Sequence, residues 1–181
     1  MKQLKHYILI GIVFVTMTGF LSHFLYDLSG HNLIVSLFTP VNESIWEHMK
    51  LLFFPMLLYS LIMICKFRRQ YPCIASALFF GILTGTLLIP ILYYAYTYVV
   101  GRNYFIADIS IFILSIVISF GLTYKLTLSH RLESHTFILG LSVCILLVCF
   151  MLFTYHPPDS TIFEDPTVIS TYSNVFKILC G

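Results

Sequence analysis

Histidine and carboxylate side chains gather in one segment of the chain, HFLYDLSGHNLIVSLFTPVNESIWEHMK. Together, imidazole and carboxylate groups suit Zn²⁺ or a similar divalent metal, which activates a water molecule for attack on a substrate. A helix brings residues four apart onto one face, so several of these groups can cooperate. The segment therefore predicts a metal site that draws on His23, Asp27, Glu47 and His48, with Glu43 as a further carboxylate. The expected cofactor is a divalent cation such as Zn²⁺.

The same segment also permits the chemistry of a serine hydrolase. Ser44 and His48 share a helix face at i and i+4, so His48 would act as the base for a Ser44 nucleophile. Asp108, from a later apolar stretch, would orient the histidine. The candidate catalytic residues are therefore Glu43, Ser44, Glu47, His48 and Asp108.

A purely structural explanation competes with both chemistries. Glu43 and Glu47 near the start of a helix favour its dipole, and Ser44 with Glu47 matches a capping box. Lys50 falls on the same face as the two glutamates and would neutralise them. His23 would then hydrogen-bond across helices. Each motif is short enough to arise by chance, so residue types alone do not separate a site from a helix end.

The elements that must position these residues are membrane-spanning helices. The 181-residue chain is 59% hydrophobic and 10% charged, with a mean hydropathy of +0.91, whereas soluble domains are about a quarter charged. This composition excludes a water-soluble globule. Apolar stretches of about 20 residues cross a bilayer as helices, so the expected fold is an all-α membrane bundle. The expected spans are residues 7–26, 49–66, 73–98, 104–125 and 136–155.

Charged residues at the ends of these stretches orient the bundle. Seven of the ten Lys and Arg residues fall at the ends that include the N-terminus, which the positive-inside rule places in the cytoplasm. An odd number of spans then puts the C-terminal tail outside. Seven of the eight Asp and Glu residues also fall on the outer side.

Counting along the helices brings the polar residues to one depth. About 20 residues counted back from Arg68 place Glu47 and His48 at the outer hydrocarbon boundary. Matching counts along the first and fourth spans bring His23 and Asp108 to the same level. Partial burial makes each of these ionisable groups costly unless it is paired. We therefore expect three helices to deliver one polar cluster.

The domain organisation expected is one bundle followed by a tail. Residues 1–155 form the five-span bundle, with an outer re-entrant or interfacial loop at about 28–41. Thr39 and Pro40 are expected to open the second long helix, because they offer a cap and a proline in the first turn. Residues 156–181 carry enough apolar side chains to pack on the outer face, where they could cover the polar cluster.

Two motifs carry a resemblance to a known family. PVNESIWEHMK at 40–50 and HPPDSTIFEDP at 156–166 resemble an uncharacterised family of small polytopic membrane proteins, found mainly in Gram-positive bacteria. The resemblance implies a multi-pass protein of the bacterial plasma membrane. It implies no reaction, because the family has no known activity.

The function that these observations favour is a membrane-embedded hydrolase or transferase that acts on a lipid or lipid-linked substrate at the outer leaflet. One alternative is a protein that binds or transports a cation or small ligand. Another is a non-enzymatic partner subunit of a membrane complex. The expected partners are membrane lipid, a lipid-linked substrate and another membrane protein, but no nucleic acid.

Overall fold

The computed structural model describes residues 2–129 and 131–165, and this part of the chain is helical without a strand. Its elements are α1 (Lys2–Leu28), α2 (Leu33–Ser36), α3 (Ile45–Phe67), α4 (Ile74–Val100), α5 (Phe105–Ser129), the short 3₁₀ helix η1 (Glu133–His135) and α6 (Thr136–Tyr155). Five of these helices are long and apolar enough to cross a membrane. The expected all-α fold class with five potential spans is therefore confirmed.

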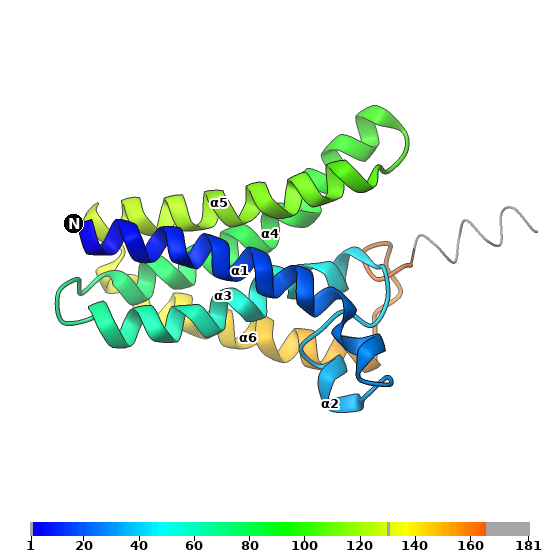
Figure 1. The fold of residues 1–181 in the computed structure, drawn as a ribbon, viewed down its shortest axis with the longest axis horizontal. Coiled ribbons are helices and arrows are strands. Elements are labelled where there is room, and N and C mark those ends of the chain that lie inside the picture. Colours follow the sequence, from blue (N-terminus) through cyan, green and yellow to red (C-terminus); the bar gives the residue numbers. More distant parts are fainter. Residues whose placement is uncertain (1, 130, 166–181) are drawn as a thin grey trace, which may run out of the picture.

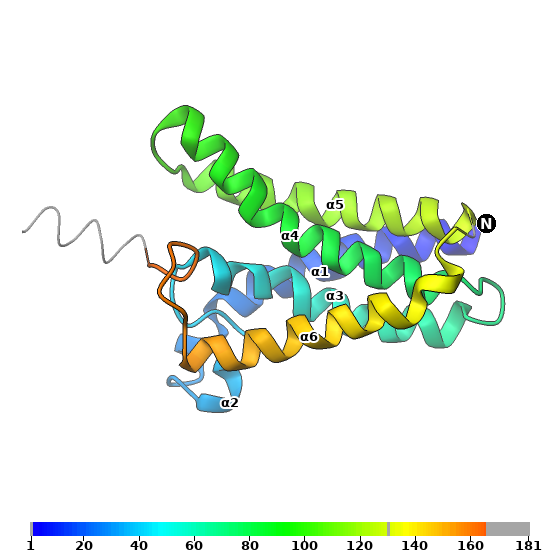
Figure 2. The ribbon, with the colours of Figure 1, turned by 180° about the vertical axis from the view of Figure 1, so that it is seen from behind.

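The five long helices form one bundle in which each runs antiparallel to the next along the chain (Figure 1). One end of the bundle gathers the N-terminus with the α3–α4 and α5–α6 connections, and most of the Lys and Arg residues lie there. We call it the basic end. The opposite end gathers α2, the start of α3, the α4–α5 turn and residues 156–165 (Figure 2). We call it the site end.

Close packing between α4 and α5 depends on two glycines. A Cβ atom at Gly81 would overlap Thr123 Oγ1, and one at Gly85 would overlap Ser119 Oγ. Both hydroxyl groups hydrogen-bond to backbone carbonyls of their own helix, Thr123 Oγ1 to Ser119 O (2.9 Å) and Ser119 Oγ to Ser115 O (2.8 Å). The glycine pair thus lets two backbones approach, as small residues commonly do between membrane helices.

Helices α1 and α5 contact each other through two matching glycine–phenylalanine pairs. A Cβ at Gly11 would lie 2.5 Å from the ring of Phe120, and a Cβ at Gly19 would lie 2.5 Å from the ring of Phe112. Each pair is eight residues from the other on both helices, in antiparallel register. The glycines let the two rings lie directly on the α1 backbone.

Helix α3 begins later than the sequence indicates, with Ser44 as its N-cap in place of Thr39. Ser44 Oγ accepts a hydrogen bond from Glu47 N (3.4 Å), and Asn42 Oδ1 accepts one from Ser44 N (3.0 Å). These side-chain acceptors give the backbone partners that compete with a helical turn. Glu43 therefore lies in the loop before α3 and not on a helix face shared with Glu47.

Residues just after α6 fold back onto the start of α3. Trp46 N donates a hydrogen bond to Ile162 O (3.0 Å), and the Trp46 ring packs on Phe163 with centroids 4.9 Å apart. Trp46 also packs on Phe150 of α6, so it is almost fully buried. The remainder of the expected tail, residues 166–181, lies outside the described part of the chain.

Candidate functional site

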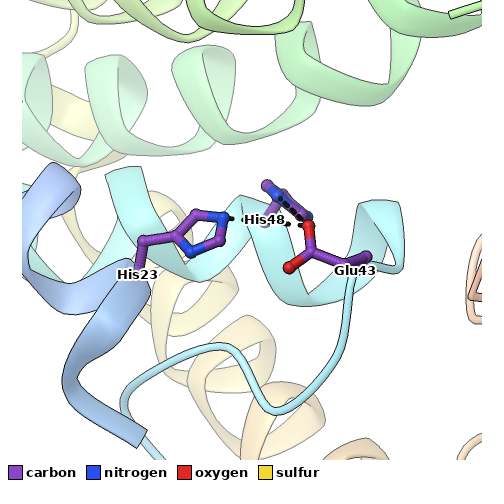
Figure 3. Close-up of side chains that lie close together, drawn as sticks. All are labelled: His23, Glu43 and His48. Carbon is purple, nitrogen blue, oxygen red and sulfur yellow. Dashed lines mark ion pairs between the residues drawn. The ribbon is translucent and has the colours of Figure 1, made fainter. Parts of the chain in front are cut away.

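Three potential metal ligands converge at the site end: His23 from the last turns of α1, Glu43 from the loop before α3 and His48 from the first turn of α3 (Figure 3). Glu43 Oε2 lies 3.4 Å from His48 Nε2 and 3.8 Å from His23 Nε2. The two imidazole rings lie 5.2 Å apart, edge to face. All three side chains retain access to solvent or ligand, because each is about one third to one half exposed. We call this group the His23–Glu43–His48 cluster.

The hydrogen bond of His48 Nδ1 leaves the other ring nitrogen, Nε2, available to bind a metal ion. His48 Nδ1 lies 2.9 Å from Ser44 O. A carbonyl oxygen only accepts hydrogen bonds, so Nδ1 carries a proton and, in the neutral ring, Nε2 has a free lone pair. Metal-binding histidines usually donate their second ring N–H to such a carbonyl, which fixes the orientation of the ring. Nε2 is also the atom that faces Glu43.

The geometry of the cluster fits a small divalent metal. Zn–N and Zn–O bonds of about 2.1 Å with tetrahedral angles hold ligand atoms roughly 3.4 Å apart. The His48 Nε2–Glu43 Oε2 distance has this value, and the three ligand atoms all lie within 4.8 Å of one another. Two histidines and one carboxylate with a free fourth position form a ligand set of catalytic zinc sites.

Backbone contacts on both sides hold Glu43 in place. Glu43 N donates a hydrogen bond to Asp165 Oδ2 (3.2 Å), in the segment that follows α6. Two residues earlier, Val41 N donates to Glu47 Oε2 (3.1 Å). The loop that carries Glu43 is therefore fixed by a carboxylate from the C-terminal segment and by another from α3.

Glu47 belongs to a buried ion pair outside the cluster. Its carboxylate accepts a hydrogen bond from Lys50 Nζ at 2.6 Å, and both side chains are buried, that of Lys50 completely. Lys50 Nζ also donates to Ser36 O (3.1 Å) and to Thr154 Oγ1 (2.6 Å). Because Val41 N bonds the same Glu47 oxygen, this pair joins α2, the loop before α3 and α6. The Glu47 carboxylate thus contacts Val41 N and Lys50 Nζ, and it is not one of the three potential metal ligands.

Two other predicted residues also have partners away from the cluster. Asp27 Oδ1 lies 3.7 Å from His31 Nδ1, and both groups are exposed. The Ser44 hydroxyl caps α3, and the contact between His48 and Ser44 is to the backbone oxygen. Among the contacts of the described residues, the structure has no hydrogen bond from Ser44 Oγ to His48, which a serine nucleophile would require.

The cluster opens into a cavity of about 600 Å³ between α1, α3, α4 and α5. The turn of α4 and α5 leaves the rest of the bundle at this end, as both ribbon views show (Figures 1 and 2). His23, Glu43 and His48 line one part of the cavity, and Asp108 of α5 lines another. Most of the remaining wall is apolar and comes from these residues: Phe20, Phe24, Ile45, Leu51, Ile89, Phe105, Ile109, Ile111 and Phe112.

Asp108 is held at the cavity by a tyrosine. Tyr96 OH of α4 donates a hydrogen bond to Asp108 Oδ1 (2.5 Å), and the same oxygen of Tyr96 accepts one from Tyr104 N (3.2 Å). Tyr93 and Asn103 also line the cavity. The first turn of α5 thus supplies a second polar group, which lines the same cavity as the cluster.

Counting residues along the helices predicts one level for His23, His48 and Asp108, and all three line the cavity. It did not separate Glu43 from Glu47, because that choice depends on where α3 begins. The order Asn42-Glu43-Ser44 indicates that Glu43 precedes the helix, since Asn and Ser both favour caps and turns. Nothing in the local sequence indicates the cavity, which arises from the angle between helices.

Comparisons with known proteins add a family but no activity. No curated protein and no solved structure matches the chain significantly. The sequence profile of DUF6512, which is described as a family of unknown function, matches residues 1–173. Since this match covers almost the whole chain, the protein belongs to the DUF6512 family of unknown function.

Proposed function

We propose that this protein is a metal-dependent hydrolase or transferase of the membrane, which acts on a lipid or lipid-linked substrate at the site end. One observation carries the proposal: two histidines and a glutamate converge at the polar part of a largely apolar cavity between potential membrane spans. Ligand sites are typically apolar pockets with a few convergent polar groups. An amphiphile matches this distribution, with its polar head at the cluster and its hydrocarbon part against the apolar wall.

The residues of the chain have distinct parts in this chemistry. A divalent metal held by His23, Glu43 and His48 would supply Lewis acidity to an ester or phosphate oxygen and make water a better nucleophile. His48 donates its Nδ1 proton to Ser44 O and so offers Nε2 as a neutral ligand. Asp108, in the same cavity, is the candidate general base that takes the proton of the attacking water or alcohol. The Tyr96 hydroxyl orients this carboxylate.

We further propose that the site end faces the extracytoplasmic leaflet of a bacterial plasma membrane. The basic end carries seven of the ten Lys and Arg residues of the chain, and such ends stay in the cytoplasm. Phospholipid headgroups and lipid-linked intermediates present their esters at this depth. The substrate would then reach the cluster without leaving the membrane.

Contacts below the cavity favour an enzyme over a transporter. Toward the basic end, the side chains of Phe112 and Leu51 are buried between α1, α3 and α5. Farther along α5, the hydroxyls of Ser119 and Thr123 bond carbonyls of their own helix. The cluster therefore suits a reaction at one face of the membrane better than passage across it.

The proposal is tested by measuring bound metal. Purified protein in detergent micelles, loaded with Zn²⁺ and dialysed, should retain one metal per chain by elemental analysis. His23→Ala, Glu43→Gln and His48→Ala should each weaken Zn²⁺ binding by more than the roughly 10- to 100-fold typical of an outer-shell partner. His31→Ala is the matched control, since it removes an exposed histidine of the same end outside the cluster and should leave binding unchanged.

A panel of radiolabelled or mass-labelled membrane lipids then tests the reaction itself. Turnover should require metal, stop on chelation, return with Zn²⁺ and be lost in Asp108→Asn while this variant still binds metal. Metal-free protein that remains active would overturn the proposal. So would a His48→Ala variant that binds Zn²⁺ as tightly as His31→Ala does.

A further inference from the structure

The floor of the cavity is built around Phe112 of α5. The Phe112 ring lies on the backbone of α1, where a Cβ at Gly19 would be 2.5 Å from the ring and 2.7 Å from Leu51 O. The ring of Phe20, one residue further along α1, packs edge to face on it at 5.5 Å. Phe112 is almost completely buried although it lines the cavity. Phe112 thus forms the α5 side of the floor, and Ile89, which is also buried and lines the cavity, forms its α4 side.

The length of the cavity wall can be estimated from the part of α5 that lines it. The lining residues of this helix run from Phe105 to Phe112. Seven residue steps at a rise of about 1.5 Å make the α5 wall of the cavity roughly 10 Å long. One leaflet contributes about half of a ~30 Å hydrocarbon core. The α5 wall is therefore shorter than a leaflet, and the buried ring of Phe112 lies at its inner end.

We propose that the cavity takes one hydrocarbon chain of an amphiphile with an anionic head and that Phe112 sets the longest chain it admits. The inference rests on the proposed function, because it places the reacting head at the His23–Glu43–His48 cluster. The head chemistry follows from the ligands: a divalent metal with one carboxylate and two neutral imidazoles keeps a net positive charge, which favours an oxyanion. The chain then runs along Leu51 and Ile109 toward Phe112.

The chain offers a matched control for this residue. Phe120 lies eight residues further along α5 and packs on Gly11 of α1 as Phe112 packs on Gly19. Phe120 is fully buried and does not line the cavity. A change at Phe120 therefore disturbs the same helix pair by the same kind of contact while leaving the floor of the cavity in place.

The experiment measures the affinity of Zn²⁺-loaded protein for a homologous series of n-alkyl phosphates, from hexyl to hexadecyl. For the unmodified protein, affinity should fall roughly tenfold at the first chain that exceeds the cavity, because overpacking a close-packed interior is unfavourable. Phe112→Ala and the milder Phe112→Leu should move this limit to longer chains. Ile109→Phe, which narrows the cavity from a half-buried wall position, should move it to shorter ones.

Phe120→Leu should keep the limit of the unmodified protein. A limit that stays in place in Phe112→Leu and Ile109→Phe, or moves equally in Phe120→Leu, would overturn the inference. Affinity that rises steadily through the whole series would overturn it as well. The alkyl chain would then extend out of the cavity between the helices, and Phe112 would not limit its length. The metal assay tests the proposed function separately: protein that binds no Zn²⁺ would contradict the proposed function, whatever the chain-length series shows.

Discussion

At the scale of single residues, the site depends on which of two glutamates faces the histidines. Glu43 and Glu47 are four residues apart and would share a face if both were helical. The structure separates them, because Glu43 precedes the N-cap Ser44 while Glu47 lies in the first turn of α3. Glu43 is thereby free to approach His48, and Glu47 turns inward to Lys50. Helix-face spacing alone does not predict this division, whereas the capping-box spacing of Ser44 and Glu47 indicates it.

Removing one charge of the Glu47–Lys50 pair should destabilise the protein, whereas replacing both charges should cost much less. Lys50→Met would leave a buried carboxylate without its cation, so we expect a loss of about 3–5 kcal/mol in the free energy of unfolding. In the double variant with Glu47→Gln, most of this loss should be recovered, since Gln still offers an oxygen to Val41 N and Met fills the volume of Lys50. Unfolding curves in detergent micelles measure both effects.

An equal loss in the double variant would mean that the hydrogen bonds of Lys50 to Ser36 and Thr154 matter more than the charge. Unchanged stability in Lys50→Met alone would contradict the prediction. Zn²⁺ binding should persist in the double variant, because neither residue belongs to the His23–Glu43–His48 cluster. This result would also separate the structural role of the pair from the role of the ligands.

At the scale of elements, the long helices follow directly from the sequence. Apolar runs of about 20 residues between charged ends have few alternatives to spanning helices, because a bilayer core leaves no partner for unpaired backbone groups. The start of α3 was less predictable. Its position depends on contacts of Asn42 with Ser44 and of Val41 with Glu47. The first is a local turn, but the second joins the backbone of the loop to a buried side chain of α3.

Helices α4 and α5 provide a test of how small residues position the site. In Gly85→Ala, the new methyl group would meet Ser119 Oγ, so we expect a loss of about 1–3 kcal/mol in the free energy of unfolding. Gly121→Ala is the control on α5, where no atom lies within 4 Å of the added methyl, and it should be neutral or slightly stabilising. Thermal unfolding in micelles compares the two variants. Equal effects would show that the glycine pair does not determine the packing.

At the scale of the whole molecule, the cavity results from helix directions that no local pattern encodes. Residues 105–112 of α5 line the cavity together with residues of α1, α3 and α4, and the α4–α5 turn leaves the rest of the bundle at this end (Figure 1). Counting residues from the charged ends nevertheless brings His23, His48 and Asp108 to the same depth, because helix rise is constant and the bilayer fixes where helices start. That all three residues line one cavity agrees with this count, but the count does not predict which side chains contact one another there.

The orientation of the whole bundle is open to a direct test. If the basic end is cytoplasmic, a cysteine at the exposed position His31 should react with a membrane-impermeant maleimide added to intact cells, whereas one at the exposed position Arg69 should react only after lysis. Both substitutions, His31→Cys and Arg69→Cys, are made in a variant whose five native cysteines are replaced by serine. The reverse labelling pattern would place the His23–Glu43–His48 cluster on the cytoplasmic side. The substrate would then have to be a lipid of the inner leaflet, because the cavity lies between the spans at the level of the cluster.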